Sequence, residues 1–179
     1  MRLLILSGEK SNIINQTMRG LKNNNPLNIR HSKDQWQGAS IPQTDKDFVQ
    51  FKTMAYGYRA AWRTLHTYYK RLRDRKKLFT VENIISRWAP PTENDTKAYI
   101  RSVLKLSSIG GKENLLPPSN PLGYSKLSRL IAAMTIIENG IRMSQVDEEA
   151  ICQGYKLAFP ENAQELDNSL LCLDEYGDW

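Results

Sequence analysis

The sequence has few residues of the types that bind metals or form disulfide bonds. Its 179 residues include two cysteines, Cys152 and Cys172, and two histidines, His31 and His66. The cysteines do not have metal-ligand spacing, and two of them define no disulfide framework. With so few ligands, a zinc site is not expected. We therefore expect no metal and no cofactor.

Long apolar runs are also absent. No stretch approaches the roughly 18 apolar residues of a membrane span. The N-terminal run Met1–Leu6 is shorter than the core of a signal peptide, and Glu9 and Lys10 follow it closely. The sequence thus predicts neither a membrane span nor an export signal, so action on a cell wall would require a phage particle or a release system.

The composition is otherwise that of a folded domain. Hydrophobic residues make up 40% of the chain, and low-complexity runs are missing, which argues against disorder. A chain of this length is sufficient for one domain with a core of packed helices. We expect an N-terminal extension at residues 1–18, the domain at 19–158 and an acidic tail at 159–179.

The charge is unevenly distributed along the chain. The net charge is +6, yet residues 161–179 hold six of the 19 acidic residues and no Lys or Arg. The first 160 residues therefore carry all 25 basic residues against 13 acidic ones. A basic body suits an anionic polymer, either nucleic acid or a bacterial wall. The acidic tail either folds back onto that body or stays loose.

Hydrophobic periodicity predicts a mostly α fold with a small β patch. Residues 47–52 alternate as a short strand would, and they could pair with residues 28–31 or 36–39. Helical spacing and capping residues predict helices at 55–75, at 80–88, after a cap at Thr92, at 125–139 and from a cap at Ser144 to about Tyr155.

The most unusual segment is an asparagine-rich loop, Arg19–Arg30, with the sequence RGLKNNNPLNIR. Asn side chains bond to their own backbone and tolerate left-handed turns, and Pro26 keeps Asn25 extended. The segment therefore predicts a rigid loop lined by amides. Amides pair with the hydroxyl and N-acetyl groups of sugars, and a nearby Trp could cover an apolar sugar face. The alternative is a cluster of exposed turns.

Glu138 is the candidate catalytic carboxylate. It follows Met134 by four residues and so continues the apolar face of the predicted helix at 125–139. It also lies in the last turn before Gly140, where the negative end of the helix dipole disfavours an ionised carboxylate. Glycosidic cleavage needs a carboxyl group that keeps its proton until the bond breaks. The alternative is a packed stem whose head reaches water or pairs with Arg142.

Glu93 is the second candidate. It is expected in the first turn of the helix capped by Thr92, where the dipole stabilises the anion. It therefore suits a stabiliser of the helix end better than a proton donor, and orientation of water or substrate stays open as a further role. Asp45, Asp47 and Asp95 are further possible second carboxylates, but no spacing selects one of them.

Several motifs together resemble a family of phage and prophage proteins. Its members are often labelled virion structural proteins and are suspected of a lysozyme-like fold. The motifs lie within residues 19–142, and the Trp-Ala-Pro-Pro block is specific to this family. They are RGxKNNNPxNIR from Arg19, WxG from Trp36, FVxF from Phe48, GxRA from Gly57, IIxRWAPPxENDT from Ile84 and ENG from Glu138.

Residues 57–104 are also similar to the second half of lytic transglycosylases. In those enzymes the acid Glu ends a helix, commonly as Glu-Ser-Gly, upstream of the remaining motifs. Here Glu138-Asn-Gly comes last instead. The resemblance therefore implies a circular permutation, with the acid helix and the Asn loop on two sides of one cleft. Without the permutation the acid would be Glu9, Glu93 or no residue.

The resemblance implies a lysozyme-like, mostly α domain that cleaves the glycan strand of peptidoglycan. Glu138 would protonate the oxygen between N-acetylmuramic acid and N-acetylglucosamine. Attack by the muramyl 6-hydroxyl would make the protein a lytic transglycosylase, and attack by water a muramidase. Expected partners are peptidoglycan and other virion proteins, in a virion or an infected cell. Substrate contacts are expected from Asn24, Asn25, Asn28, Trp36, Trp88 and Tyr99.

Two other functions stay open. A non-catalytic virion or wall-binding protein would keep the fold without turnover. A nucleic-acid-binding protein would use the basic cluster Lys70–Lys77. That cluster has no recognised reading motif, and its neighbouring aromatic residues fall on the core side of the helix. Nucleic acid is therefore not the expected partner.

Overall fold

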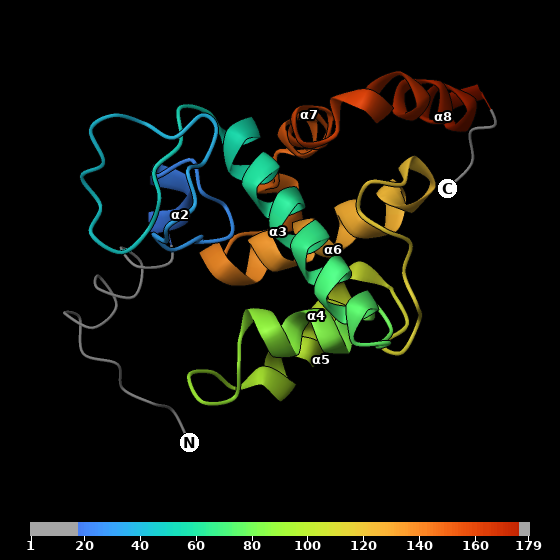
Figure 1. Cartoon of the computed structure of the whole chain (residues 1–179), viewed down its shortest axis with the longest axis horizontal. Coiled ribbons are helices and arrows are strands. Elements are labelled where there is room, and N and C mark those ends of the chain that lie inside the picture. The colour runs from blue at the N-terminus through green and yellow to red at the C-terminus, as the bar shows by residue number, and fades with distance from the viewer. Residues whose placement is uncertain (1–17, 176–179) are drawn as a thin grey trace.

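The computed structural model describes residues 18–175, so nearly all of the expected N-terminal extension lies outside the described residues. The described residues are mostly helical, which confirms the mostly α fold predicted from periodicity (Figure 1). The α-helices are α2 (Arg19–Lys22), α3 (Met54–Asp74), α4 (Val81–Trp88), α5 (Thr96–Ser107), α6 (Tyr124–Asn139), α7 (Glu148–Ala158) and α8 (Ala163–Glu175). Short 3-10 turns are η1 (Pro121–Gly123), η2 (Met143–Gln145) and η3 (Pro160–Asn162).

Helix α3 crosses the middle of the fold and packs along α7, while α6 packs against α5 (Figure 1). Trp62 of α3 is fully buried between two aromatic rings, stacked on Tyr124 at 5.6 Å and edge-on to Tyr155 at 5.1 Å. Its indole nitrogen donates to the carbonyl of Ile151 at 3.1 Å, so the buried polar group is paired. The apolar stripe predicted for α3 is therefore the centre of the core.

The helix containing Tyr99 begins later than the sequence suggested. Asp95, not Thr92, is the N-cap of α5, and its carboxylate accepts from the backbone N–H of Ala98 at 2.9 Å. The backbone N–H groups of Glu93 and Asn94 both bond to the carbonyl of Pro90, which closes a turn before the helix. The prediction that Glu93 lies in a first helical turn is therefore wrong. A helix capped by Thr92 would have Glu93 and Asn94 in its first turn, but these two residues belong to the turn that follows Pro90.

The C-terminal region also differs from expectation. Asp147, not Ser144, caps α7, accepting from the backbone N–H of Ala150 at 2.8 Å. Residues 160–175 then form η3 and α8, which the sequence analysis did not predict. Phe159 and Leu166 are buried in the main core, so this region packs onto the domain.

The β patch consists of two isolated antiparallel bridges, Arg30 with Phe48 and Ala39 with Phe51. The predicted strand at 47–52 therefore pairs with both of its possible neighbours, one at each end. Its inward side chains form a second, smaller core that is separate from the main one. The buried members of this core are Ile29, Val49, Phe51 and Ala60.

Gly57 in the first turn of α3 lets the Asn loop approach the helix closely. A Cβ atom at this position would lie 2.0 Å from the carbonyl oxygen of Asn24 and 2.7 Å from Pro26. A larger residue would therefore push the loop away from the helix. No helix of residues 18–175 has the length and apolar content that crossing a membrane requires.

Candidate functional site

Glu138 lies in the last turn of α6, which ends at Gly140 in a left-handed conformation with φ 61°. Its Oε1 atom accepts hydrogen bonds from Tyr99 Oη at 2.8 Å and from Trp88 Nε1 at 3.2 Å. Its Oε2 atom accepts from Asn28 Nδ2 at 3.1 Å. The Asn loop, α4 and α5 thus each supply a donor to one carboxyl group. The expected alternative pairing with Arg142 is not among the salt bridges of the described residues.

The hydroxyl group of Tyr99 keeps the proton that it donates to Glu138. Burial of the hydroxyl raises the pKa of Tyr99 well above its usual value, and the neighbouring Glu138 carboxylate raises it further. The phenol therefore keeps its proton throughout the physiological range. The hydroxyl can therefore donate to Oε1 of Glu138 throughout that range.

The carboxyl group of Glu138 faces a cleft with a volume of about 420 Å³. The walls combine two carboxylates, two amides and three aromatic rings, which is the mixture expected for a sugar site. The lining residues are Leu27, Asn28, Ile29, Arg30, Phe48, Thr64, Tyr68, Trp88, Ala89, Glu93, Asn94 and Glu138. The structure therefore brings Glu138, Glu93, Asn28 and Trp88 together, with Tyr99 bonded to Glu138.

The other predicted asparagines serve the loop itself. Asn25 is fully buried, and its amide bonds to the backbone of Ile29 and to the carbonyl of Val49 at 2.7 Å. Asn24 donates to the carbonyl of Phe51 at 3.0 Å and has a φ of 49°, a conformation that Asn tolerates. Neither lines the cleft, so the structure gives no support to their predicted sugar contacts. Amides that satisfy buried backbone groups are unavailable to a ligand.

Trp36 is also away from the cleft. It packs against the small core, and its indole N–H is buried without a partner in the described residues. Sequence proximity to the Asn loop suggested a sugar contact for this ring. The structure instead uses the ring to close the small core, and Trp88 is the Trp of the cleft.

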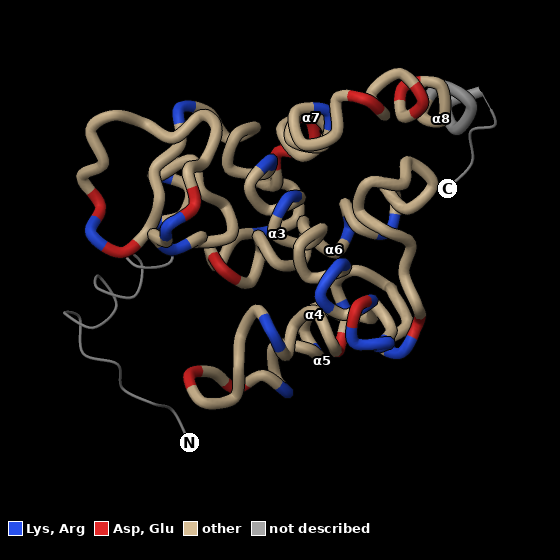
Figure 2. The backbone as a smooth tube through the Cα atoms, viewed as in Figure 1, with Lys and Arg blue, Asp and Glu red and all other residues tan. Residues whose placement is uncertain are grey.

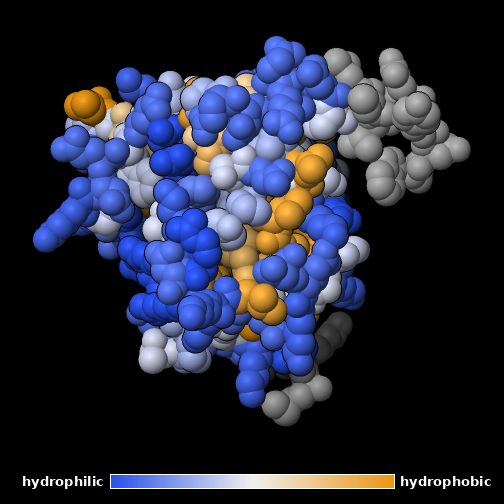
Figure 3. Space-filling model, turned by 45° about the vertical axis from the view of Figure 1, so that its right-hand side comes forward, coloured by the Kyte–Doolittle hydropathy of each residue, from blue (hydrophilic) through white to orange (hydrophobic). Residues whose placement is uncertain are grey.

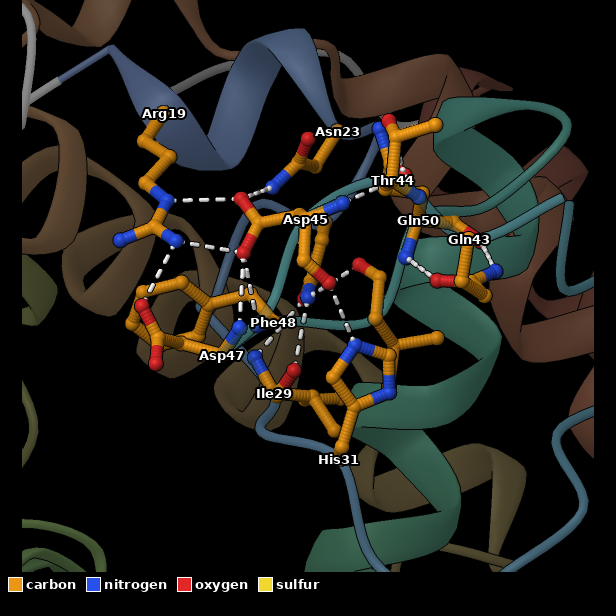
Figure 4. A network of polar contacts seen from close by, with 12 residues as sticks. Arg19, Asn23, Ile29, His31, Gln43, Thr44, Asp45, Asp47, Phe48 and Gln50 are labelled. Atoms are coloured by element: carbon orange, nitrogen blue, oxygen red, sulfur yellow. Dashed lines mark hydrogen bonds and ion pairs between the residues drawn. The ribbon is translucent and has the colours of Figure 1, made fainter.

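Asp45 anchors α2 to the loop that follows it (Figure 4). Its carboxylate accepts from Arg19 Nε at 2.6 Å and from Asn23 Nδ2 at 2.7 Å, and also from two backbone N–H groups. The Arg19 guanidinium holds the pKa of Asp45 well below its usual range. Asp47 also accepts from Arg19, at 2.8 Å, and Asp95 is a helix cap, and none of the three lines the cleft that Glu138 faces.

Asn139 is a site residue that the sequence analysis did not single out. It is buried next to Glu138, and its amide donates to the carbonyl of Pro26 at 2.7 Å and to that of Thr135 at 2.9 Å. Gly20 is packed against it, because a Cβ atom there would lie 2.5 Å from Asn139 Oδ1. The Asn of the Glu-Asn-Gly motif therefore connects the Asn loop to α6. Its position beside Glu138 was the sequence signal that could have identified it.

No family model matches the chain. The chain is 38% identical over 149 residues to Protein P5 of Pseudoalteromonas phage PM2, and the match covers 82% of this chain and 85% of the phage protein. The chain belongs to the Protein P5 family. The origin of this relative supports the phage association that the motifs predicted. Its name states no activity, so cleavage of peptidoglycan stays a prediction.

A second groove of the described chain has fewer groups that could take part in catalysis. This groove of about 440 Å³ is mainly apolar, lined by Leu106, Tyr124, Ala132, Met143, Ile151 and Leu170 with a few polar residues. Figure 3 shows a band of hydrophobic residues across one otherwise hydrophilic face. Within the described chain, no group of His, Cys, Asp and Glu has a geometry suited to a metal ion.

The basic cluster Lys70–Lys77 lies at the exposed end of α3, where Lys and Arg gather in Figure 2. Its neighbours Tyr68 and Tyr69 pack against the main core. Tyr69 packs edge-on to Phe79, and Tyr68 lines the cleft that Glu138 faces. Neither ring therefore forms a stacking platform with the cluster, which single-strand binding proteins require.

Proposed function

We propose that this chain cleaves the glycan strand of peptidoglycan in association with a phage. The observation that carries the proposal is the Glu138 carboxyl group, held by Trp88, Tyr99 and Asn28 at the wall of a cleft lined by amides and aromatic rings. A fixed carboxyl group in such a cleft has the position that general acid catalysis needs. No cofactor enters the reaction.

The two oxygens of Glu138 have different roles in this proposal. Oε1 accepts hydrogen bonds from Tyr99 and Trp88, whereas among the described residues Oε2 accepts a hydrogen bond only from Asn28, which itself lines the cleft. Oε2 would therefore carry the proton and transfer it to the glycosidic oxygen as the bond to the anomeric carbon breaks. The two donors on Oε1 would stabilise the carboxylate that remains.

The nucleophile is proposed to be the muramyl 6-hydroxyl. The Glu138 carboxylate would accept the proton of that hydroxyl while its oxygen bonds to the anomeric carbon, giving a 1,6-anhydro sugar. Attack by water would need a second carboxylate as base in an inverting reaction. Glu93 lines the cleft, but it is exposed, and no side-chain hydrogen bond within the described chain orients it. The site thus favours transglycosylation.

The test is cleavage of purified peptidoglycan sacculi, followed by mass analysis of the released fragments. The wild type should release anhydro-muropeptides. Glu138→Gln should lower the rate by on the order of 10²–10⁴, because it removes the acid and keeps the shape. Glu149→Gln, which changes an exposed Glu of α7, is the matched control and should cleave at the wild-type rate.

The possible outcomes separate the functions. Fragments with reducing ends at muramic acid would assign hydrolysis by water. A Glu138→Gln variant as fast as the wild type would transfer the acid role to Glu93. A folded wild type that binds sacculi but releases nothing would overturn the enzymatic proposal and assign a wall-binding virion protein.

A further inference from the structure

The cleft continues past Asn28 into a second hollow, which the proposed proton transfer does not use. This hollow has a volume of about 340 Å³ and is lined by Arg19, Asn28, Arg30, Asp47 and Phe48. Asn28, Arg30 and Phe48 also line the main cleft. The two hollows therefore form one groove, which runs from Glu138 over the Asn loop to Arg30.

The charged groups of the second hollow are not equivalent. Arg19 is held by Asp45 at 2.5 Å and by Asp47 at 2.8 Å, so its charge is compensated and Asp47 is paired. Arg30 is exposed and has no carboxylate partner among the residues that the structure describes. The groove therefore presents one guanidinium whose donors are available to a ligand.

Phe48 holds this guanidinium in place. The Arg30 guanidinium carbon lies 5.3 Å from the centroid of the Phe48 ring, and that of Arg19 lies 4.7 Å from the same centroid. The ring is half-buried, and the Phe48 backbone N–H is bonded to Asp45 at 3.0 Å. A guanidinium over a fixed ring loses less freedom on binding than a free one, and its planar donors match a carboxylate.

We propose that Arg30 is an anion subsite that binds a carboxylate of the peptide stem attached to the glycan strand. The chain would then prefer glycan that carries its peptide over a neutral glycan of the same length. The identity of the ligand rests on the proposed function, but recognition of the anion can be measured without cleavage. A phosphate of a wall polymer would offer similar chemistry, so the test includes it.

The experiment measures binding of three soluble ligands to the full chain by calorimetry: a disaccharide–peptide fragment of peptidoglycan, a neutral N-acetylglucosamine oligomer and a glycerol phosphate oligomer. The wild type should bind the disaccharide–peptide about tenfold more tightly than the neutral oligomer, since a charge-assisted hydrogen bond is the added contact. Arg30→Ala should lose this preference. The preference should also weaken as salt is added, because Arg30 is exposed.

The matched control is Arg73→Ala. Arg73 is an exposed guanidinium 5.9 Å from the centroid of Tyr69, and it also pairs with Asp74 at 3.1 Å. The change therefore removes a guanidinium and its contact with an aromatic ring at a place away from the cleft. It should leave the preference unchanged. A preference that survives Arg30→Ala, or that falls equally in Arg73→Ala, would overturn the subsite.

The remaining outcomes distinguish the subsite from the enzyme. Displacement of the disaccharide–peptide by the phosphate oligomer at equal concentration would overturn the peptide as the source of the anion, and a wild type that binds none of the ligands would overturn the subsite altogether. Active cleavage of sacculi with an unchanged Arg30→Ala preference would reject the subsite and keep the enzyme. Binding that depends on Arg30, in a protein that does not cleave sacculi, would keep the subsite and reject the enzyme.

Discussion

Tyr99→Phe tests how Glu138 is held in its cleft. The change removes one hydroxyl group, whose only hydrogen bond within the described chain runs to Glu138 Oε1 at 2.8 Å. The ring stays in place beside the core, and Oε1 keeps the indole donor of Trp88 at 3.2 Å. The variant therefore isolates one of the two donors that, in the proposed reaction, stabilise the carboxylate left after proton transfer.

The expected fall in the cleavage rate of Tyr99→Phe follows from the charge of the hydrogen-bond acceptor, the Glu138 carboxylate. A hydrogen bond to a charged group contributes about 1.5–3 kcal/mol, and every 1.4 kcal/mol of barrier is about tenfold in rate. If the bond is at full strength only when Glu138 is ionised, kcat should fall about 10- to 100-fold. Because Tyr99 does not bind the sugar in this proposal, KM should change little.

The assay compares initial rates of sacculus cleavage and melting temperatures of the wild type, Tyr99→Phe and Tyr69→Phe. Tyr69 is the control, because its ring packs edge-on to Phe79 at 5.5 Å and lies outside the cleft lining. Its variant should keep the wild-type rate. A Tyr99→Phe enzyme as fast as the wild type would refute the role of this donor, and a rate loss matched by a large fall in melting temperature would show that the hydroxyl supports the fold instead.

Two further predictions concern the frame of the site. Asn139→Ala should lower the free energy of unfolding by about 2 kcal/mol, because it leaves the buried carbonyl of Pro26 without its donor; chemical denaturation measures this, and an unchanged stability would show that the loop is held by other contacts. Asp45→Asn should also destabilise the protein at pH 7, by about 2 kcal/mol. The folded pKa of Asp45 is depressed by Arg19, so the stability it contributes is present above the unfolded pKa of about 3.9 and is lost as the pH falls towards the folded pKa. The gap between wild type and variant should therefore narrow below about pH 4, and a gap independent of pH would contradict the assigned role of Arg19.

Local patterns in the sequence determined the main helices. The apolar spacing around Trp62 predicted a helix at 55–75, and the structure has α3 at Met54–Asp74. The stripe before Gly140 predicted 125–139, and α6 is Tyr124–Asn139. Both helices have a strong period of apolar residues and a clear end, and such signals act within a few turns of one chain segment.

Where several residues could serve the same local purpose, the sequence alone did not choose. Thr92 and Asp95 are both good caps, and the hydrogen bonds of the turn after Pro90 decided for Asp95. Helix α8 read as an acidic tail because it lacks basic residues. Its Leu166 became a core residue only when the rest of the fold offered a place to bury it.

The site depended most on tertiary structure. Glu138 was identifiable from its place at the end of an apolar helix face, but Asn24, Asn25 and Asn28 looked alike as sugar contacts. Only the fold separates them, since Asn25 pairs with buried backbone and Asn28 reaches Glu138 across 110 residues of sequence. Periodicity and capping are local and can be read along the chain, whereas the donors of Trp88, Tyr99 and Asn28 meet at one carboxyl group only after the helices have packed.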